Sequence, residues 1–268
     1  MFLQKLLIAL QLLIKPYTNR IKLGEGGLVV FNFTHALIAY NRWQQVIFET
    51  ALSLLVMCVL YGYNDYIDAE KDKINPKKDT RFINLVLENQ PFFAAVLIVV
   101  QILSIMLAVV FVSWFSAGAL VVLYLLNYFY SKIAKAIPVL DIVTVALWGG
   151  LFVCLVSKFD WRIATAAAVM TGIAHFFQIV TDKDTDTQNK VVTSAVKFKE
   201  QANWALLLLC ALLMFALWKV NGSFFLMAMG ALPFAFFFLS KNVTLSWHVS
   251  RLSFFISWLI ILKSLYAG

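Results

Sequence analysis

Long apolar runs separated by short polar segments dominate the sequence, and this pattern restricts the possible folds more than any other feature. Hydrophobic residues make up 62% of the 268 residues and charged residues only 13%, whereas soluble domains are about 45 to 50% apolar. A helix that crosses a bilayer needs about 20 mainly apolar residues. The runs predict an all-α, polytopic membrane helical bundle of about nine transmembrane helices, at 22–40, 45–63, 91–112, 114–131, 138–157, 161–181, 202–219, 222–240 and 247–265.

The basic residues predict how such a bundle is oriented. One side of the nine-helix arrangement has only Arg42, Lys158, Arg162, Lys219 and Lys263, which leaves 17 of the 22 lysines and arginines on the other side. Cytoplasmic loops carry the excess of such residues. We therefore expect an integral protein of a plasma or inner membrane, with its amino terminus and most of its basic loops facing the cytoplasm.

The loops and the first segment predict a single transmembrane domain over residues 1–268. Met1 to Ile14 resembles the core of a signal peptide, but no small-residue cleavage site follows, so we expect an uncleaved helix at the membrane interface. No linker rich in proline, glycine or serine divides the chain. The net charge of +8 is spread over short loops beside apolar runs. This distribution favours the lipid bilayer and a phosphorylated substrate as partners and argues against nucleic acid.

Two acidic clusters stand out because carboxylates are rare in the rest of the chain. Asp65, Asp68 and Asp72 follow one apolar run, and Asp182 and Asp186 follow another. Helical spacing places each set on one helix face. Carboxylates this close repel one another unless a cation lies between them, and Mg²⁺ prefers oxygen ligands and keeps water and phosphate as the remaining ones. The clusters therefore predict a cage for a metal-bound pyrophosphate at the cytoplasmic face.

Three segments resemble signatures of the UbiA superfamily of intramembrane prenyltransferases. Residues 64–72 match its NDxxDxxxD signature, residues 182–186 its DxxxD signature with Thr193 at the usual threonine position, and residues 130–135 its YSxxxK stretch. The resemblance covers essentially the whole chain. It implies a nine-helix bundle around a central cavity, in which Mg²⁺ holds an isoprenyl diphosphate whose tail lies towards lipid.

The resemblance also implies roles for individual residues. Negative charge builds on the departing pyrophosphate, and Mg²⁺ would neutralise it, with the catalytic and metal-binding set being Asp65, Asp68, Asp72, Asp182 and Asp186. Asn64 would add a neutral oxygen ligand or a hydrogen bond. Basic side chains would bind the phosphate oxygens, with Lys135 and Arg81 as first candidates and Lys132 and Lys190 as second candidates. For Lys77, Lys78 and Lys183 we favour a purely topological role.

Polar residues inside apolar runs are candidates for contacts within the cavity, because such residues usually face a cavity or a partner. Asn127 and His175 are of this kind, and His175 is either the acceptor of a substrate proton or a structural histidine. Near the amino terminus, Arg20, Lys22 and Asn32 are the candidates for binding an acceptor. We interpret Asp141 as the cap of the helix that follows Pro138.

Two positions depart from the pattern of the UbiA superfamily. Phe82 follows Arg81 where proline is common, and Lys190 replaces a usual glycine. We therefore expect an unusual loop shape around the pyrophosphate.

Several functions are compatible with these features. The first hypothesis is transfer of an isoprenyl group from its diphosphate to a small-molecule acceptor, for which we favour an aromatic ring. A membrane terpene cyclase would use the same ionisation without an acceptor. A divalent-cation transporter is a third hypothesis, although its carboxylates would be expected near the membrane midplane. A purely structural subunit would have no use for five mutually repelling carboxylates.

Overall fold

The computed structural model describes residues 2–22, 27–40, 42–73, 78–156 and 160–266. Within these residues the chain is helical and contains no strand. Two short 3₁₀ segments, η1 (Ala134–Ala136) and η2 (Lys199–Ala202), accompany the α-helices. These are α1 (Phe2–Lys22), α2 (Gly27–Ala39), α3 (Trp43–Asp72), α4 (Thr80–Glu88), α5 (Gln90–Phe111), α6 (Trp114–Lys132), α7 (Leu140–Val153), α8 (Trp161–Thr181), α9 (Lys183–Gln188), α10 (Ser194–Phe198), α11 (Asn203–Asn221), α12 (Phe224–Ser240) and α13 (Val243–Tyr266).

Each predicted apolar run coincides with a helix of this set. Six helical segments of the described chain are long and apolar enough to cross a membrane, and they contain α3, α5, α6, α8, α11 and α13. The apolar helices α2, α7 and α12 are shorter, with 10 to 17 residues. The all-α, apolar architecture is confirmed, whereas the count of about nine crossings stays a prediction.

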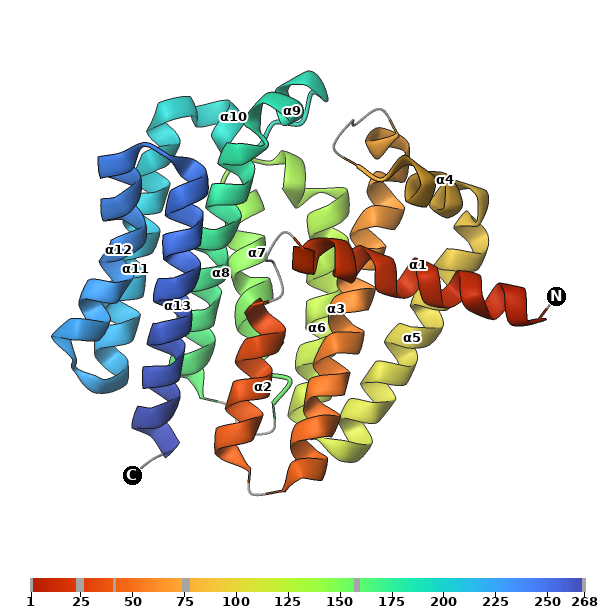
Figure 1. Ribbon diagram of the computed structural model, residues 1–268, viewed down its shortest axis with the longest axis horizontal. Coiled ribbons are helices and arrows are strands. Elements are labelled where there is room, and N and C mark those ends of the chain that lie inside the picture. Colours follow the sequence, from red (N-terminus) through yellow and green to blue (C-terminus); the bar gives the residue numbers. More distant parts are fainter. Residues whose placement is uncertain (1, 23–26, 41, 74–77, 157–159, 267–268) are drawn as a thin grey trace.

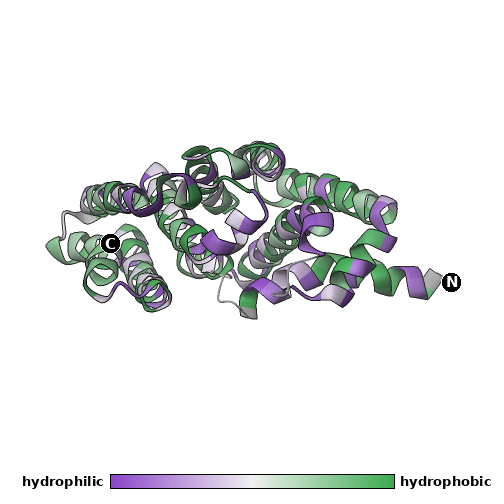
Figure 2. Cartoon of the chain, turned by 90° about the horizontal axis from the view of Figure 1, so that it is seen from above, coloured by the Kyte–Doolittle hydropathy of each residue, from purple (hydrophilic) through white to green (hydrophobic). Residues whose placement is uncertain are grey.

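The helices are arranged as an upright bundle with smaller elements at one end. Figure 1 shows the apolar helices running roughly side by side, with α4, α9 and α10 at the upper end and α1 lying across the bundle. Figure 2 views the molecule from above and shows hydrophilic stretches interrupting helices that are otherwise largely hydrophobic. The predicted place of α1 at the membrane interface stays a prediction.

The end of α3 is joined to α5 through a capped short helix. The carboxylate of Asp79 accepts hydrogen bonds from the backbone N–H groups of Arg81 and Phe82, which fixes the start of α4. The hydrogen bond from Phe82 is the main cause that lowers the pKa of Asp79 below its ordinary value. The side chain of Phe82 packs into a small hydrophobic core that joins α4 to α1, α3 and α5. The polar segment after α3 is thereby tied to the bundle.

The larger core surrounds α8, which contacts α7, α11 and α13. The pair α7 and α8 packs most extensively, and glycine makes this possible. A Cβ atom placed on Gly149 would lie 2.0 Å from Oγ1 and 2.4 Å from Cβ of Thr171. Contacts that short require the helices to move apart, so Gly149 sets the distance between α7 and α8.

We expect Gly149→Ala to destabilise the bundle by about 2 kcal/mol, because overpacked cores lose about 1 to 3 kcal/mol. Gly118→Ala is the matched control, since a Cβ atom at Gly118 in α6 meets nothing within 4 Å, and alanine is the better helix former. Thermal unfolding of the two purified variants in detergent provides the measurement. Equal melting temperatures would contradict the proposed close approach of α7 and α8.

Candidate active site

Both acidic clusters lie at the same end of the bundle, as Figure 1 shows for the ends of α3 and α8. Helix α3 has 30 residues, which at about 1.5 Å per residue gives about 45 Å. A bilayer core is only about 30 Å thick. The last turns of α3, with Asp65, Asp68 and Asp72, therefore extend beyond the length needed to cross a membrane.

Basic side chains from two other segments form ion pairs with the carboxylates at the end of α3. Lys78 Nζ is 3.0 Å from Asp72 Oδ2 and 3.9 Å from Asp65 Oδ1, and Arg20 Nη2 of α1 is 3.8 Å from the same Asp65 oxygen. The guanidinium of Arg20 also lies over the ring of Tyr61, 5.3 Å from its centroid. Lys78 thus does more than the topological interpretation predicts, and Arg20 joins α1 to the site.

Lys135 connects the two clusters. It forms an ion pair with Asp68, whose side chain is almost fully buried, and it interacts electrostatically with Asp186. The position of Lys135 in η1, directly after α6, places it between the ends of α3 and α8. The last turn of α6 contributes Ser131, whose Oγ donates to Asn64 Oδ1 at 3.5 Å.

The second cluster spans a break between two helices. Asp182 is the C-cap of α8, and Asp186 belongs to the short helix α9. The N–H of Asp186 still donates to the carbonyl of Asp182 at 2.8 Å, so the helical spacing predicted from the sequence is kept across the break. Thr193 Oγ1 donates to Asp186 Oδ2 at 3.5 Å.

Asp141 anchors the loop that follows α9. Its buried carboxylate accepts hydrogen bonds from the N–H and Oγ of Ser194, both at 2.6 Å, and from the N–H of Ile142 at 2.9 Å. The predicted capping role is wrong in detail, because the N-cap of α7 is Val139 and Asp141 lies within the first turn, where it accepts from the N–H of Ile142. The bonds to Ser194 exceed that prediction, because they fix the start of α10 and with it Thr193.

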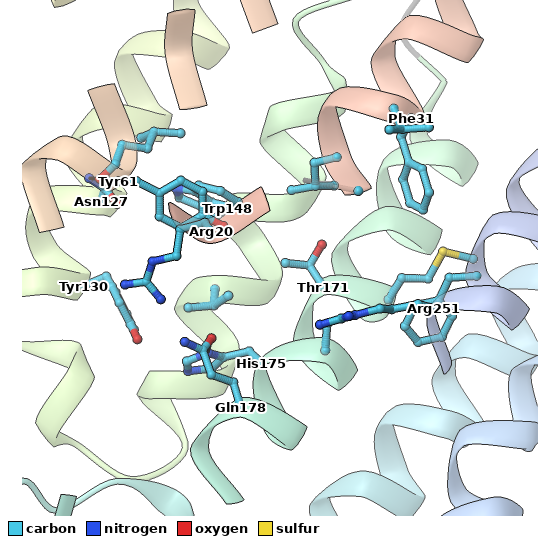
Figure 3. Close-up of a pocket in the computed structure, with 18 of the residues that line it drawn as sticks. Arg20, Phe31, Tyr61, Asn127, Tyr130, Trp148, Thr171, His175, Gln178 and Arg251 are labelled. Atoms are coloured by element: carbon cyan, nitrogen blue, oxygen red, sulfur yellow. Dashed lines mark hydrogen bonds between the residues drawn. The ribbon is translucent and has the colours of Figure 1, made fainter. Parts of the chain in front are cut away.

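A cavity of about 330 Å³ extends from this end into the bundle. Helices α3 and α8 supply facing parts of its wall, and α1, α2, α6, α7 and α13 contribute as well. Figure 3 shows the aromatic rings of Phe31, Tyr61, Tyr130 and Trp148 around it. Its lining is mostly apolar, with a few polar groups, as is typical of small-molecule sites.

Four of the predicted polar residues line the cavity, and Arg20 of α1 is one of them. Asn64 and Asn127 do so from α3 and α6, and the Nδ2 of Asn127 donates to the carbonyl of Leu60 at 3.2 Å. His175 does so from α8, with its Nδ1 3.4 Å from Gln178 Oε1. Arg251 of α13 also lines the cavity, stacked 4.0 Å from the centroid of the Trp247 ring. Gln178 and Arg251 were not among the site residues predicted from the sequence.

Other predicted residues lie apart from the carboxylates. Arg81, Lys132 and Lys190 are exposed, and within the described residues none of them forms an ion pair with the two clusters. Their role in binding phosphate stays a prediction. Asn32 is buried and donates to Ser53 and to the carbonyl of Phe152, so its contacts are structural. Lys77 and the side chain of Lys22 lie outside the described residues.

Lys190 also departs from ordinary backbone geometry. Its φ angle is 57°, in the left-handed region that costs about 1 to 2 kcal/mol for residues other than glycine. This is the position where the sequence pattern has lysine in place of a usual glycine. The loop therefore keeps a backbone conformation that suits glycine, and it carries a lysine side chain in addition.

The donor chemistry at the acidic ends fits a hard cation. Oδ1 of Asp65 and Oδ1 of Asp68 are buried without a hydrogen-bond partner, and Mg²⁺ takes such oxygens. Within the described residues, however, no three histidine, cysteine or acidic side chains lie close enough together to hold a metal ion by themselves. Protein oxygens here therefore account for part of a coordination shell, which leaves positions for water or phosphate.

Comparisons with known proteins give a match to one family model and to several solved structures. The model of the UbiA prenyltransferase family matches residues 28–261. None of the curated proteins matches the sequence. Among solved structures, a UbiA homologue from Archaeoglobus fulgidus bound to GPP and Mg²⁺ is 17% identical, with a TM-score of 0.69 over 97% of this chain and 98% of its own.

Two further structures have a similar fold. The same archaeal homologue bound to DMAPP and Mg²⁺ is 17% identical, with a TM-score of 0.65 over 94% of this chain and 98% of its own. A structure of digeranylgeranylglyceryl phosphate synthase in membranes is 18% identical, with a TM-score of 0.62 over 99% of this chain and 98% of its own. At this level of identity the structures establish the fold.

We expect Asp141→Asn to loosen the loop between α9 and α10, because an asparagine cannot accept both hydrogen bonds from Ser194 with a carboxylate's charge. Hydrogen bonds to a charged group contribute about 1.5 to 3 kcal/mol, so backbone amide exchange over residues 190–198 should accelerate at least tenfold. Asp184→Asn, at an exposed carboxylate of α9, is the control and should leave exchange unchanged. The same exchange in both variants would show that Asp141 does not anchor the loop.

Proposed function

The chain belongs to the UbiA prenyltransferase family, and we propose on this basis that it is a Mg²⁺-dependent intramembrane prenyltransferase. It transfers an isoprenyl group from an isoprenyl diphosphate to a small-molecule acceptor that carries an aromatic ring. The observation that carries this proposal is the position of two carboxylate-bearing helix ends beside a cavity lined by aromatic and aliphatic side chains. The charged diphosphate thus lies beside the polar helix ends, and the apolar prenyl chain has the apolar cavity.

The carboxylates of Asp65, Asp68, Asp72, Asp182 and Asp186 are the proposed metal ligands, with Asn64 beside them. Bound Mg²⁺ supplies Lewis-acid stabilisation of the negative charge that develops on the pyrophosphate. The solved A. fulgidus homologue has been determined with Mg²⁺ and with GPP or DMAPP, which supports this choice of metal and of donor substrate. Buried carboxylate oxygens without hydrogen-bond partners support it from the side of this chain.

Cationic side chains complete the diphosphate site. Lys135 lies between the two clusters and is the best placed donor to phosphate oxygens. Lys78 and Arg20 contact the first cluster directly. Arg81, Lys132 and Lys190 are exposed at the same end, and we propose that they attract the anionic diphosphate and bind its outer oxygens. These groups neutralise the part of the negative charge on the diphosphate that the metal ions do not neutralise.

The cavity accommodates the reacting carbon and the acceptor. Breaking the C–O bond of an allylic diphosphate leaves positive charge on the prenyl fragment, and aromatic faces stabilise such a cation. Tyr61 and Trp148 line the cavity with ring centroids 6.3 Å apart, close to the Asn64 end of α3. Apolar walls limit the access of water, which would otherwise capture the cation as an alcohol.

The membrane setting follows from the family and from the apolar helices. The excess of basic residues at the end that carries the carboxylates supports a cytoplasmic active site in a plasma or inner membrane. Such a site receives its polar diphosphate from water, and the apolar tail lies within the bundle or the lipid. The carboxylates are confined to one end of the bundle, which does not suit a transporter whose ion site lies near the midplane.

We expect Asp68→Asn and Asp186→Asn to lower pyrophosphate release from geranyl diphosphate by at least about 10²-fold, because removal of transition-state electrostatic stabilisation has effects of this size. The measurement uses purified protein in proteoliposomes with Mg²⁺, and EDTA should have the same effect as the substitutions. Glu70→Gln and Asp184→Asn alter exposed carboxylates within the same segments and serve as matched controls. Full activity of either cluster variant would refute the proposal.

The same assay separates transfer from cyclisation. Farnesyl and geranylgeranyl diphosphates are supplied without an acceptor, and the organic products are identified by mass spectrometry. A transferase forms only the linear alcohols from capture by water, whereas a terpene cyclase forms cyclic hydrocarbons or cyclic alcohols. Cyclic products would replace the proposed transfer by cyclisation at the same site.

A further inference from the structure

One polar atom in the cavity has no partner in the protein. The side chain of His175 is 6% exposed, and its Nε2 is buried without any hydrogen bond. Such groups are rare, because a buried polar atom without a partner is costly. His175 lies in the C-terminal part of the apolar helix α8 and lines the cavity, so its Nε2 is available to a bound molecule.

Neighbouring side chains fix the orientation of the ring. Nδ1 of His175 is 3.4 Å from Gln178 Oε1, and the ring of Tyr130 lies edge-on at a centroid distance of 5.7 Å. Figure 3 shows the imidazole beside the Gln178 amide, with Thr171 further along the same helix. When Nδ1 carries the hydrogen and donates to Gln178, the lone pair is on Nε2. Gln178 thereby orients a hydrogen-bond acceptor into the cavity.

His175 is also the only neutral base among the titratable side chains that line the cavity in the described part of the chain. Arg20 and Arg251 are cationic, and Tyr61 and Tyr130 carry phenol groups, which are weak acids and not bases. Outside the cavity wall, Asp141 is engaged by Ser194 and Lys135 by Asp68. Among the described side chains of the cavity wall, His175 is therefore the one suited to accept a proton released there.

We propose that His175 Nε2 accepts the proton that an aromatic acceptor loses from its hydroxyl group during prenylation, and that Gln178 is the positioning residue for His175. The inference rests on the proposed function and names the residues that contact the acceptor in the cavity. The indole Nε1 of Trp148 is likewise buried without a partner and lines the same cavity. It supplies a donor for the hydroxyl oxygen, so a phenol finds both an acceptor and a donor.

The proton and electron pairs balance in this step. The C–O bond of the prenyl diphosphate breaks, and its electron pair leaves with the pyrophosphate. A ring carbon of the phenol forms the new bond to the prenyl carbon with an electron pair of the ring, while the O–H proton moves to His175 Nε2. The resulting dienone isomerises to the prenylated phenol, and the imidazolium returns its proton to solvent.

The test compares His175→Gln with the wild-type protein in proteoliposomes that contain geranyl diphosphate, Mg²⁺ and phenol, hydroquinone or 1-naphthol. Glutamine keeps a hydrogen-bonding group near the position of Nε2 but is not a base. We expect the ratio of prenylated phenol to released pyrophosphate to fall at least tenfold, with geraniol formed instead. In the wild type, the rate of phenol prenylation should rise with pH through one ionisation, and this rise should be absent in His175→Gln.

Two controls keep the test decisive. His248→Gln changes an exposed histidine of α13 and should behave as wild type. His175→Asn provides a second substitution if the glutamine variant does not accumulate in membranes. An unchanged product ratio and pH profile in the His175 variants would overturn the inference. Pyrophosphate release by the wild type without prenylation of any phenol would also overturn it, whereas absence of pyrophosphate release would refute the proposed function itself.

Gln178 is tested by two substitutions, one that has no hydrogen-bonding group and one that has a carboxylate. Gln178→Leu removes the contact to Nδ1, and Gln178→Glu retains an oxygen that can accept from it. We expect the leucine variant to shift the pH profile of phenol prenylation and to lower the product ratio, and the glutamate variant to restore the ratio. Equal effects of both substitutions would show that Gln178 has only a packing role.

Discussion

Like charges held close together at the end of an apolar bundle are the constraint on which this structure depends. Carboxylates at such distances raise one another's energy unless cations lie between them. The chain meets this requirement with basic side chains from separate segments, namely Arg20 of α1, Lys78 before α4 and Lys135 of η1. The same ion pairs therefore join α1, the loop after α3 and the end of α6 around a single acidic centre. In the proposed function, Mg²⁺ takes over part of this compensation, and the ammonium groups become available to phosphate oxygens.

The sequence predicts the parts of the fold that depend on hydropathy and helical period. Apolar runs locate most of the long helices to within about five residues, although α3 continues to Asp72, well beyond the predicted end at residue 63, and the spacing of Asp65 and Asp68 places them on this extension. The number of crossings is harder to derive, because α2, α7 and α12 are shorter than a bilayer normally requires. Length and composition do not separate a short crossing from a helix that is buried within the protein.

Contacts between distant segments are the part of the site that the sequence does not predict. Asp141 suggests a helix cap when its neighbours in the chain are considered, yet its main partner is Ser194, 53 positions later. Lys78 belongs to a segment that looks like an ordinary basic loop in the sequence. Only the position of α4 brings its ammonium group close to the carboxylate of Asp72. Lys190 is the instructive exception, because the replaced glycine already pointed to unusual backbone geometry, and its φ angle of 57° agrees.

Helical geometry links the charged centre to the cavity. On α3, Tyr61 and Asn64 line the cavity directly before Asp65 and Asp68, and on α8 His175 and Gln178 precede Asp182 in the same way. Seven residues of helix span about 10 Å, so the cavity-lining residues are one to two turns from the carboxylates. In a prenyl diphosphate, the carbon that reacts is bonded directly to the diphosphate. A site that holds the diphosphate at the helix ends must therefore hold the acceptor within these first turns, which is where the buried Nε2 of His175 lies without a hydrogen-bond partner.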